Sequence, residues 1–340
     1  MQKKKIKNGA FSSLVSAGAI IKTAFCGPCF GAGDTPANGA FSIRHSTRNF
    51  PNREGSKIQN GQLSSVALMD ARSIAATAAN KGFLTPATEF DTEFSGKKYF
   101  FDKGIYEKRV YDSKGVAHPE VEIQFGPNIK DWPSMKELSD DLLVKVVSEI
   151  HDPVTTTDEL IPSGETSSFR SNPLGLAEFT LSRRDPSYVG KAKAVRDLTD
   201  DVKAEVENVA KAFDAKYADM AGRVSKAGLG STIFAVKPGD GSAREQAASC
   251  QKVLGGWANI ANEYATKRYR SNLINWGMLP FIYKDGDKNL PFANDDYVFV
   301  PNVKKMITDK LSTTKAYAIK KDANEAFHQL NASSLTFGPM

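Results

Sequence analysis

The sequence STIFAVKPGDGSAREQAASCQKVLG (residues 231–255) is the most informative about the fold, because it predicts a strand, a turn and a helix in succession. Residues 231–237 are mostly apolar and partly β-branched, as buried strands are. The PGDG sequence at 238–241 favours a turn, and residues 242–255 have the composition of a helix. Such a glycine-rich turn gathers backbone N–H groups at the helix N-terminus, where an anion is stabilised.

Two residues after this turn carry candidate chemistry. The sequence predicts Ser242 in the first turn of the helix, where it could act as a general base through its alkoxide or bind a carboxylate. Arg244 would add positive charge there. A serine that caps the helix is the common structural alternative, and the motif alone leaves both interpretations open.

Other segments continue the alternation of strands and helices. LLVKVVSEI (142–150) predicts a buried strand, and LPFIY (279–283) predicts another. Residues 190–227 have helical periodicity and balanced charge. Strands that alternate with helices predict an α/β architecture.

The N-terminal region has weaker patterns. Residues 10–45 predict short strands and Gly/Pro-rich loops. Residues 96–130 predict strands, because they are rich in aromatic and charged residues and turn residues separate the runs. The Ala-rich segment 70–82 predicts a helix with Asp70 as its N-cap and Gly82 at its C-terminal end.

Composition limits the class of protein. The chain has 340 residues, 41% of them hydrophobic and 25% charged, which predicts a globular protein of two or three domains. A formal net charge of +6 suits anionic partners. Aromatic residues do not alternate with basic ones, so we do not expect a nucleic-acid partner. Only three cysteines indicate a reducing compartment, and we expect a cytoplasmic location.

The first 26 residues imitate a secretion signal, with a basic start and a short apolar run before Cys26. Lys22 interrupts that run, and Phe25 is too bulky for the position before a cleavage site. The run is also shorter than the roughly 20 residues of a membrane span. We therefore expect neither secretion nor a membrane anchor.

The segment FCGPCFG (25–31) holds two of the three cysteines, Cys26 and Cys29. This spacing suits a thiol redox pair, half of a zinc site, or two ligands of an iron–sulfur cluster. The spacing alone does not decide among them. Cys250 lies far away, and its predicted place is the buried core.

Three arginines stand in polar loops, namely Arg48, Arg53 and Arg170. A guanidinium binds a carboxylate with two parallel hydrogen bonds, so Arg48 and Arg53 together could hold a di- or tricarboxylate. Solvated surface charge is the alternative for each of them.

Four motifs in order resemble the C-terminal half of the aconitase family of hydro-lyases. They are CGPCFG (26–31), STRNFPNREG (46–55), TTDELIPSG with SSFRSNP (156–173), and the segment 239–281 that begins with GDGSARE. The resemblance implies an α/β fold in which residues 1–95 end the cluster-bearing α/β domain. Residues 96–140 would be a linker with short strands, and residues 141–340 a swivelling β/β/α domain.

The resemblance also implies roles. In that family three cysteines hold a [4Fe–4S] cluster whose open iron acts as a Lewis acid. Cys26 and Cys29 would be two of the ligands, and Ser242 would remove a proton as the catalytic base. The substrate, a hydroxy di- or tricarboxylic acid, would bind through four arginines: Arg48, Arg53, Arg170 and Arg244.

The chain departs from the family's pattern in several places. The third cysteine ligand is not in this chain, which implies an N-terminal half as a separate chain or as missing sequence. Four further residues differ from the aconitases proper: Thr47, Glu159, Ala243 and Gln246. These differences leave the particular hydroxy acid open.

Two other functions compete with the hydro-lyase. A relative that has lost its cluster would be a non-catalytic protein that binds RNA or another anion, which the basic composition favours. A thiol redox protein would need a lowered pKa at Cys26.

Overall fold

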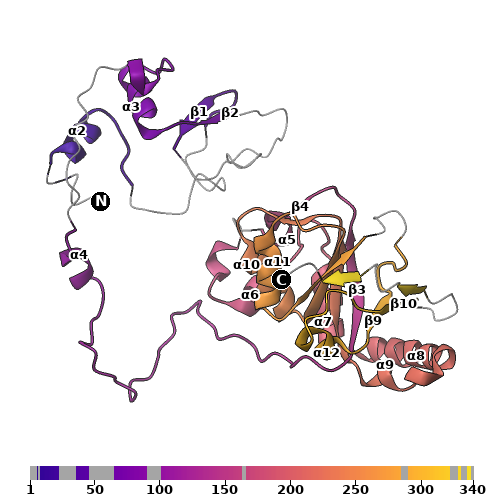
Figure 1. Ribbon diagram of the computed structural model, residues 1–340. Coiled ribbons are helices and arrows are strands. Elements are labelled where there is room, and N and C mark those ends of the chain that lie inside the picture. The colour runs from indigo at the N-terminus through magenta and orange to yellow at the C-terminus, as the bar shows by residue number, and fades with distance from the viewer. Residues whose placement is uncertain are drawn as a thin grey trace. The chain divides into compact units, whose positions relative to one another are not determined.

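The computed structural model describes residues 6, 8–22, 36–45, 65–89, 101–162, 166–284, 290–321, 328–330 and 335–337. The chain divides into two compact units, unit 1 (residues 1–123) and unit 2 (residues 124–340). Figure 1 shows both units and labels many of their helices and strands.

Unit 1 contains two short parallel strands and small helices. Phe41 of β1 lies opposite Ser65 of β2. The elements are α2 (Ala10–Ser16), β1 (Phe41–Arg44), β2 (Ser65–Leu68), α3 (Ala71–Ala79), the 3₁₀ helix η2 (Ala87–Glu89) and α4 (Gly104–Glu107).

Helix α3 confirms the prediction for residues 70–82. The Asp70 side chain accepts hydrogen bonds from the backbone N–H groups of Arg72 and Ser73, as an N-cap does. After the helix, Gly82 has a φ of 91° and donates its N–H to the carbonyl of Thr77. A glycine is favoured there because other residues rarely adopt positive φ.

Two predictions for unit 1 are wrong. Residues 10–16 form helix α2 rather than a strand or loop, although β1 is a strand as expected. The described residues 101–123 of this unit contain α4 and no strand. Phe101 and Tyr111 are 60% and 83% exposed, so the aromatic side chains that suggested strands are not buried against a neighbour.

Unit 2 is built on an eight-stranded mixed sheet in the order β11-β10-β9-β3-β5-β7-β8-β12. Strands β3, β5, β7 and β8 pair in parallel at its centre, and antiparallel strands lie on both sides of them. The strands are β3 (Leu142–Ile150), β5 (Gly228–Ala235), β7 (Gly256–Ala261), β8 (Leu279–Tyr283), β9 (Tyr297–Val300), β10 (Ala316–Ile319), β11 (His328–Leu330) and β12 (Leu335–Phe337).

Strand β3 shows why the sheet sits in the middle of the core. Leu142, Val144 and Val146 join an apolar cluster on one face, and Leu143 joins another cluster on the opposite face. A strand covered on both faces is expected to be a nearly continuous apolar run. Three polar residues, Lys145, Ser148 and Glu149, interrupt this run, and Lys145 is buried and forms an ion pair with Glu205.

Helices cover the sheet. The helices that contribute side chains to the apolar cluster of Tyr188 and Tyr269 include α5 (Thr157–Leu160), α6 (Pro173–Ala177), α7 (Tyr188–Arg196), α10 (Arg244–Val253) and α11 (Lys267–Asn275). The others are η3 (Ser167–Phe169), α8 (Asp200–Lys216), η4 (Ala218–Met220), α9 (Arg223–Lys226) and α12 (Val303–Thr308).

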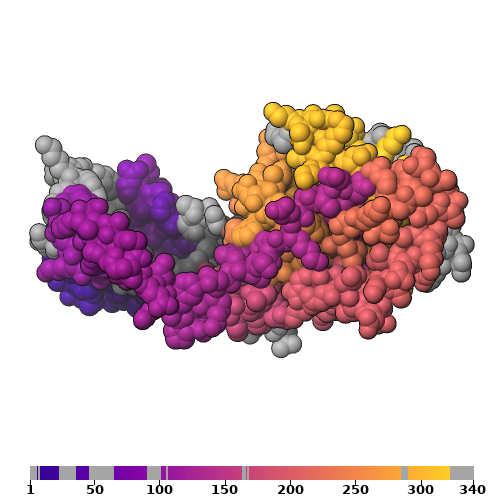
Figure 2. All heavy atoms as spheres, turned by 90° about the horizontal axis from the view of Figure 1, so that it is seen from below, coloured from indigo at the N-terminus to yellow at the C-terminus, as the bar shows by residue number. Residues whose placement is uncertain are grey.

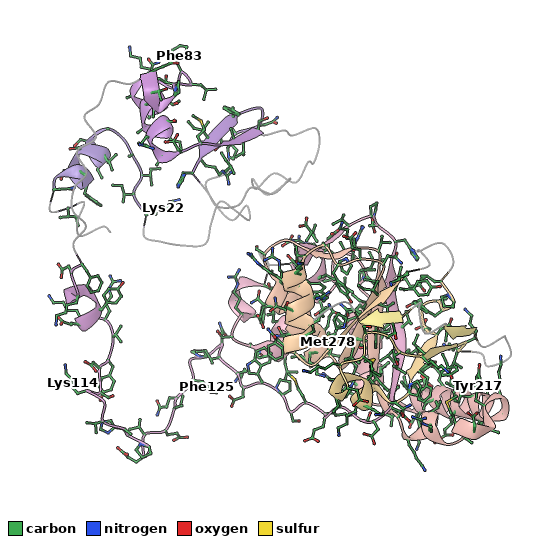
Figure 3. All side chains as sticks on the ribbon, viewed as in Figure 1. Lys22, Phe83, Lys114, Phe125, Tyr217 and Met278 are labelled. Atoms are coloured by element: carbon green, nitrogen blue, oxygen red, sulfur yellow. The ribbon has the colours of Figure 1, made fainter. Side chains whose placement is uncertain are left out.

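Figures 2 and 3 show where two of these helices and two labelled residues lie in unit 2. Helices α8 and α9 form the salmon surface at one end of unit 2 in Figure 2. Tyr217 follows α8 at this outer edge, whereas Met278 lies inside the unit, at 1% exposure (Figure 3).

The α/β fold class is confirmed. The division into residues 1–95, 96–140 and 141–340, and the swivelling of the last part, stay predictions. In the described part of the chain, every helix is too short or too polar to cross a lipid bilayer.

Candidate functional site around the glycine loop

The glycine-rich loop lies beside a second loop from far along the chain. Its strand β6 (Pro238–Asp240) pairs in parallel with β4 (Thr155–Thr156). Thr155 lies opposite Pro238, and Thr156 lies opposite Asp240. The two motifs that the sequence places more than 80 residues apart are therefore neighbours, since TTDELIPSG begins at Thr156.

The two glycines of the loop allow close approaches that no other residue permits. Gly239 has a φ of 97°, and a Cβ there would lie 2.3 Å from the ring of Tyr269. Gly241 has a φ of 122°, and a Cβ there would lie 2.3 Å from the hydroxyl oxygen of Thr157. Both the backbone conformation and the space require glycine.

Ser242 lies in the loop and not in the first helical turn, so that prediction is wrong. Helix α10 begins at Arg244, and its N-cap is Ala243, whose side chain cannot accept a hydrogen bond. The alternative role of Ser242 as the capping residue is therefore wrong as well. The cause lies in the tertiary structure, because the backbone N–H of Ala243 donates to Thr157 Oγ1 at 3.3 Å and residue 241 has a positive φ.

Ser242 and Arg244 are both half-buried at the start of α10. The N-terminus of this ten-residue helix carries partial positive charge, and no side chain caps it. A serine next to a helix N-terminus and a guanidinium is in an environment that stabilises an anion, including an alkoxide.

Arg170 reaches the same helix from another segment. It follows η3 and lines a small cavity of about 40 Å³ together with Glu245 and Gln246 of the first turn of α10. The carboxylate of Glu245 accepts a hydrogen bond from Trp276 Nε1 at 3.1 Å. The lining of this cavity also includes Ser249, Cys250 and Val253, so it follows one side of α10, and it includes neither Ser242 nor Arg244.

The remaining predicted site residues, Cys26, Cys29, Arg48 and Arg53, lie outside the described residues, as does Thr47. The structure therefore does not describe the two cysteines proposed as ligands of an iron–sulfur cluster. Within the described ranges, no three His, Cys, Asp or Glu side chains come together as metal ligands would.

Cys250 confirms the prediction of a buried core cysteine. Its side chain is 2% exposed in the apolar cluster beneath α10. Burial raises the pKa of its thiol to about 12, with the charge of Glu245 adding to the effect. A protonated thiol buried in an apolar cluster differs from the accessible thiolates that bind metals, which agrees with a structural role for Cys250.

Glu159, one of the departures from the family's pattern, has a structural partner here. Its carboxylate accepts a hydrogen bond from the backbone N–H of Thr156 at 2.7 Å and closes a capping box at the start of α5. Arg184 Nε lies 3.3 Å from the same side chain. Glu159 therefore stabilises the loop beside the site.

Thr157 contributes to the site, although sequence reasoning missed it. It is fully buried and contacts both the loop glycine and the residue before α10. A threonine within a polar loop gives no sequence signal of a partner 86 residues away. The family resemblance includes its motif but implies no role for it.

Two family models match this chain. The aconitase family (aconitate hydratase) matches residues 1–76, and the aconitase C-terminal domain matches residues 190–286. The second match includes the glycine loop, Ser242 and Arg244. The chain belongs to the aconitase family.

Individual relatives agree with this assignment. The chain is 23% identical to a probable mitochondrial aconitate hydratase of Dictyostelium discoideum, over 97% of this chain and 44% of the relative. It is 25% identical to a mitochondrial aconitate hydratase of Arthroderma benhamiae, over 82% of this chain and 36% of the relative. The chain thus spans less than half the length of these relatives.

Among solved structures, a 3-isopropylmalate dehydratase of Methanocaldococcus jannaschii is 20% identical to this chain. The match covers 56% of this chain and 83% of that protein, with a TM-score of 0.32.

Proposed function

We propose that this chain is the C-terminal part of an aconitase-like hydro-lyase that acts on a hydroxy di- or tricarboxylic acid. The observation that carries the proposal is the contact of the glycine loop with Thr157, which positions the start of α10. The glycine loop, Ser242 and Arg244 lie within the region that matches the aconitase C-terminal domain. Membership of the family supports the reaction type, and the basic residues at this end of α10 support an anionic substrate.

In this proposal Ser242 removes the proton from the carbon next to the one that bears the hydroxyl. An alkoxide needs a local excess of positive charge, which Arg244 and the N-terminus of α10 supply. Arg170 and Arg244 bind carboxylates of the substrate, and the planar guanidinium suits that contact. Arg48 and Arg53 are proposed for the remaining carboxylate.

We further propose Cys26 and Cys29 as two ligands of a [4Fe–4S] cluster, with the third ligand on an N-terminal half outside this chain. When bound, such a cluster supplies a Lewis acid for the hydroxyl that leaves. The buried thiol of Cys250 agrees with a third ligand from elsewhere, because its surroundings indicate a structural role. The cytoplasmic location stays a prediction.

The test is anaerobic cluster reconstitution of the full chain, with and without an N-terminal half. Turnover of a hydroxy acid is expected only when both are present. Ser242→Ala should then lower kcat by about 100-fold to 10,000-fold, as loss of a general base does. Ser271→Ala, an exposed serine on α11, is the matched control and should leave kcat unchanged.

Two outcomes would contradict the proposal. One is turnover by this chain alone with Ser242→Ala equally active. The other is the absence of any turnover together with RNA binding that weakens steeply with salt, which would favour the non-catalytic binding protein.

A further inference from the structure

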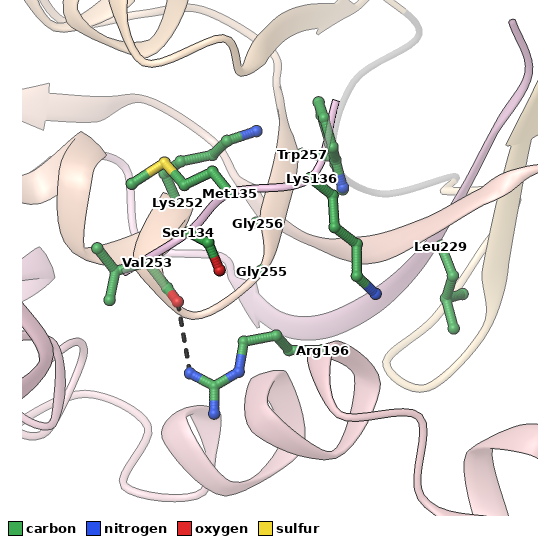
Figure 4. A pocket seen from close by; sticks show the side chains of 10 residues that line it. All are labelled: Ser134, Met135, Lys136, Arg196, Leu229, Lys252, Val253, Gly255, Gly256 and Trp257. Carbon is green, nitrogen blue, oxygen red and sulfur yellow. Dashed lines mark hydrogen bonds between the residues drawn. The ribbon is translucent and has the colours of Figure 1, made fainter. Parts of the chain in front are cut away.

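A second basic pocket lies at the opposite end of α10 from Ser242. It is a cavity of about 80 Å³ whose lining includes Lys136, Arg196, Lys252 and Trp257 (Figure 4). These residues come from the segment before β3, from α7, from the last turn of α10 and from β7. One ordered water needs roughly 10–15 Å³ on this measure, so the cavity has room for several waters or a small oxyanion.

Lys252 is the unusual residue of this pocket. The residue is only 8% exposed, and its Nζ lies 3.3 Å from the centre of the Trp257 ring. Among the described residues, no carboxylate lies within ion-pair distance of this ammonium group. A cation–π contact offsets part of the desolvation cost, but a buried charge ordinarily has a hydrogen-bonded counter-charge.

The guanidinium of Arg196, which also lines the pocket, already has partners within the chain. Arg196 donates from Nε and Nη2 to the carboxylate of Asp197 at 2.7 and 3.0 Å, and from Nη1 to the carbonyl of Val253 at 3.4 Å. Its charge is therefore compensated, and Asp197 is engaged with it rather than with Lys252. The exposed Lys136 also interacts electrostatically with Asp197, so the uncompensated positive charge of the pocket belongs to Lys252.

The protonation of Lys252 agrees with this environment. Burial lowers the pKa of its ammonium group to about 8. At pH 7 the group is still mostly charged, so a bound anion would gain a direct electrostatic contact in a poorly solvated place.

We propose that this pocket is a binding site for a small oxyanion, a phosphate or a carboxylate, next to the ammonium group of Lys252, with Lys136 lining another part of the cavity. The oxyanion supplies the counter-charge that Lys252 lacks within the described chain. Trp257 and the Gly255–Gly256 backbone form the walls, and Arg196 fixes one side through its bond to Val253. This site is separate from the proposed Ser242 site and does not depend on its function.

The first experiment uses the unmodified full chain. Each lysine is acetylated by a limiting amount of acetic anhydride at pH 8, and the modified peptides are quantified by mass spectrometry, in chloride, inorganic phosphate or malonate of equal ionic strength. A bound oxyanion raises the pKa of Lys252 and covers it, so its acetylation at pH 8 should slow by about fivefold or more for a rise of about one pKa unit. Exposed Lys211 on α8 is the internal control and should not change.

Phosphate and malonate distinguish the two chemical classes of ligand. Protection by phosphate alone indicates a phosphoryl group, and protection by malonate alone indicates a carboxylate. Protection by both also supports the proposal. Equal rates for Lys252 in all three salts, or equal slowing of Lys211, would overturn it.

The second experiment is calorimetric titration of phosphate, and of malonate where malonate protects, into variants of the full chain. Lys252→Met keeps the stem over Trp257 and removes the charge, so affinity should fall by about tenfold or more. Lys136→Met should weaken binding by a smaller factor, and Lys211→Met should not change it. Unchanged affinity of folded Lys252→Met would overturn the proposal, and the protection experiment decides if that variant does not fold.

Discussion

The backbone N–H of Ala243 donates a hydrogen bond to the hydroxyl oxygen of Thr157 at 3.3 Å. This contact joins the loop before α10 to the start of α5 and keeps Ser242 outside the helix. The candidate base is therefore positioned by a residue from another part of the chain.

Replacing Thr157 should disturb this junction. Thr157→Val keeps the volume of the buried side chain and removes the acceptor for the Ala243 N–H. We expect the free energy of unfolding to fall by about 1 kcal/mol, because a partly buried N–H group loses its partner. Urea unfolding followed by circular dichroism measures this change.

The matched control is Ser271→Ala, which removes an exposed hydroxyl that bonds within α11. It should change the free energy of unfolding by less than about 0.5 kcal/mol. Equal effects of the two substitutions would show that the Thr157 contact contributes nothing special.

Gly239 should tolerate no side chain. Gly239→Ala places a methyl group against the Tyr269 ring at a φ of 97°, so we expect a loss of about 2 kcal/mol or more in unfolding free energy. Gly190→Ala on α7 has open space around it and an ordinary φ, and should stabilise the chain by about 0.5–1 kcal/mol.

Thermal unfolding of both glycine variants tests this expectation. The melting temperature should move down for Gly239→Ala and up for Gly190→Ala. A Gly239→Ala variant as stable as the unmodified chain would contradict the close approach of the loop to Tyr269.

Lys252 should make stability depend on pH in the alkaline range. Its pKa is about 8 in the folded chain and 10.5 for a fully solvated lysine, so the unfolded state binds more protons between these values. The free energy of unfolding therefore rises with pH from about 8 to about 10, by roughly 2–3 kcal/mol from this residue.

Urea unfolding at pH 7.5, 8.5 and 9.5 isolates that contribution when Lys252→Met is measured in parallel. The buried tyrosines titrate in both proteins, so their effects cancel in the difference. A difference between the two proteins that is independent of pH would show that Lys252 is not desolvated.

Cys250 should be unreactive in the folded chain. Its thiol is buried and protonated, so iodoacetamide at pH 8 should modify it at least about a hundredfold more slowly than in the urea-unfolded chain. Mass spectrometry of the Cys250 peptide measures the two rates, and similar rates would contradict the burial.

The cysteine set also gives a prediction about the proposed cluster. After reconstitution with an N-terminal half, Cys26→Ala and Cys29→Ala should lose iron and the visible absorption of the cluster. Cys250→Ala should keep both and lose only folding stability, by about 1–3 kcal/mol for a small core truncation. Loss of iron in Cys250→Ala alone would contradict the assignment.

Local patterns predicted the elements whose side chains are buried in a regular way. The runs at 142–150, 231–237 and 279–283 correspond to strands β3, β5 and β8, because a central parallel strand needs apolar residues on both faces. The described residues 101–111 contain no strand, although their aromatic side chains favoured one, since those side chains are exposed rather than packed on a sheet.

The family, the α/β class and the residue types of the glycine loop could be predicted from the sequence, since they depend on local composition and ordered motifs. The start of α10 could not be predicted, because it depends on a contact between Ala243 and Thr157, which lies 86 residues away. Only the tertiary structure shows that Lys252, which looks like a surface charge in the sequence, is buried on Trp257. Burial and long-range contacts arise from packing between distant segments, and no local pattern encodes them.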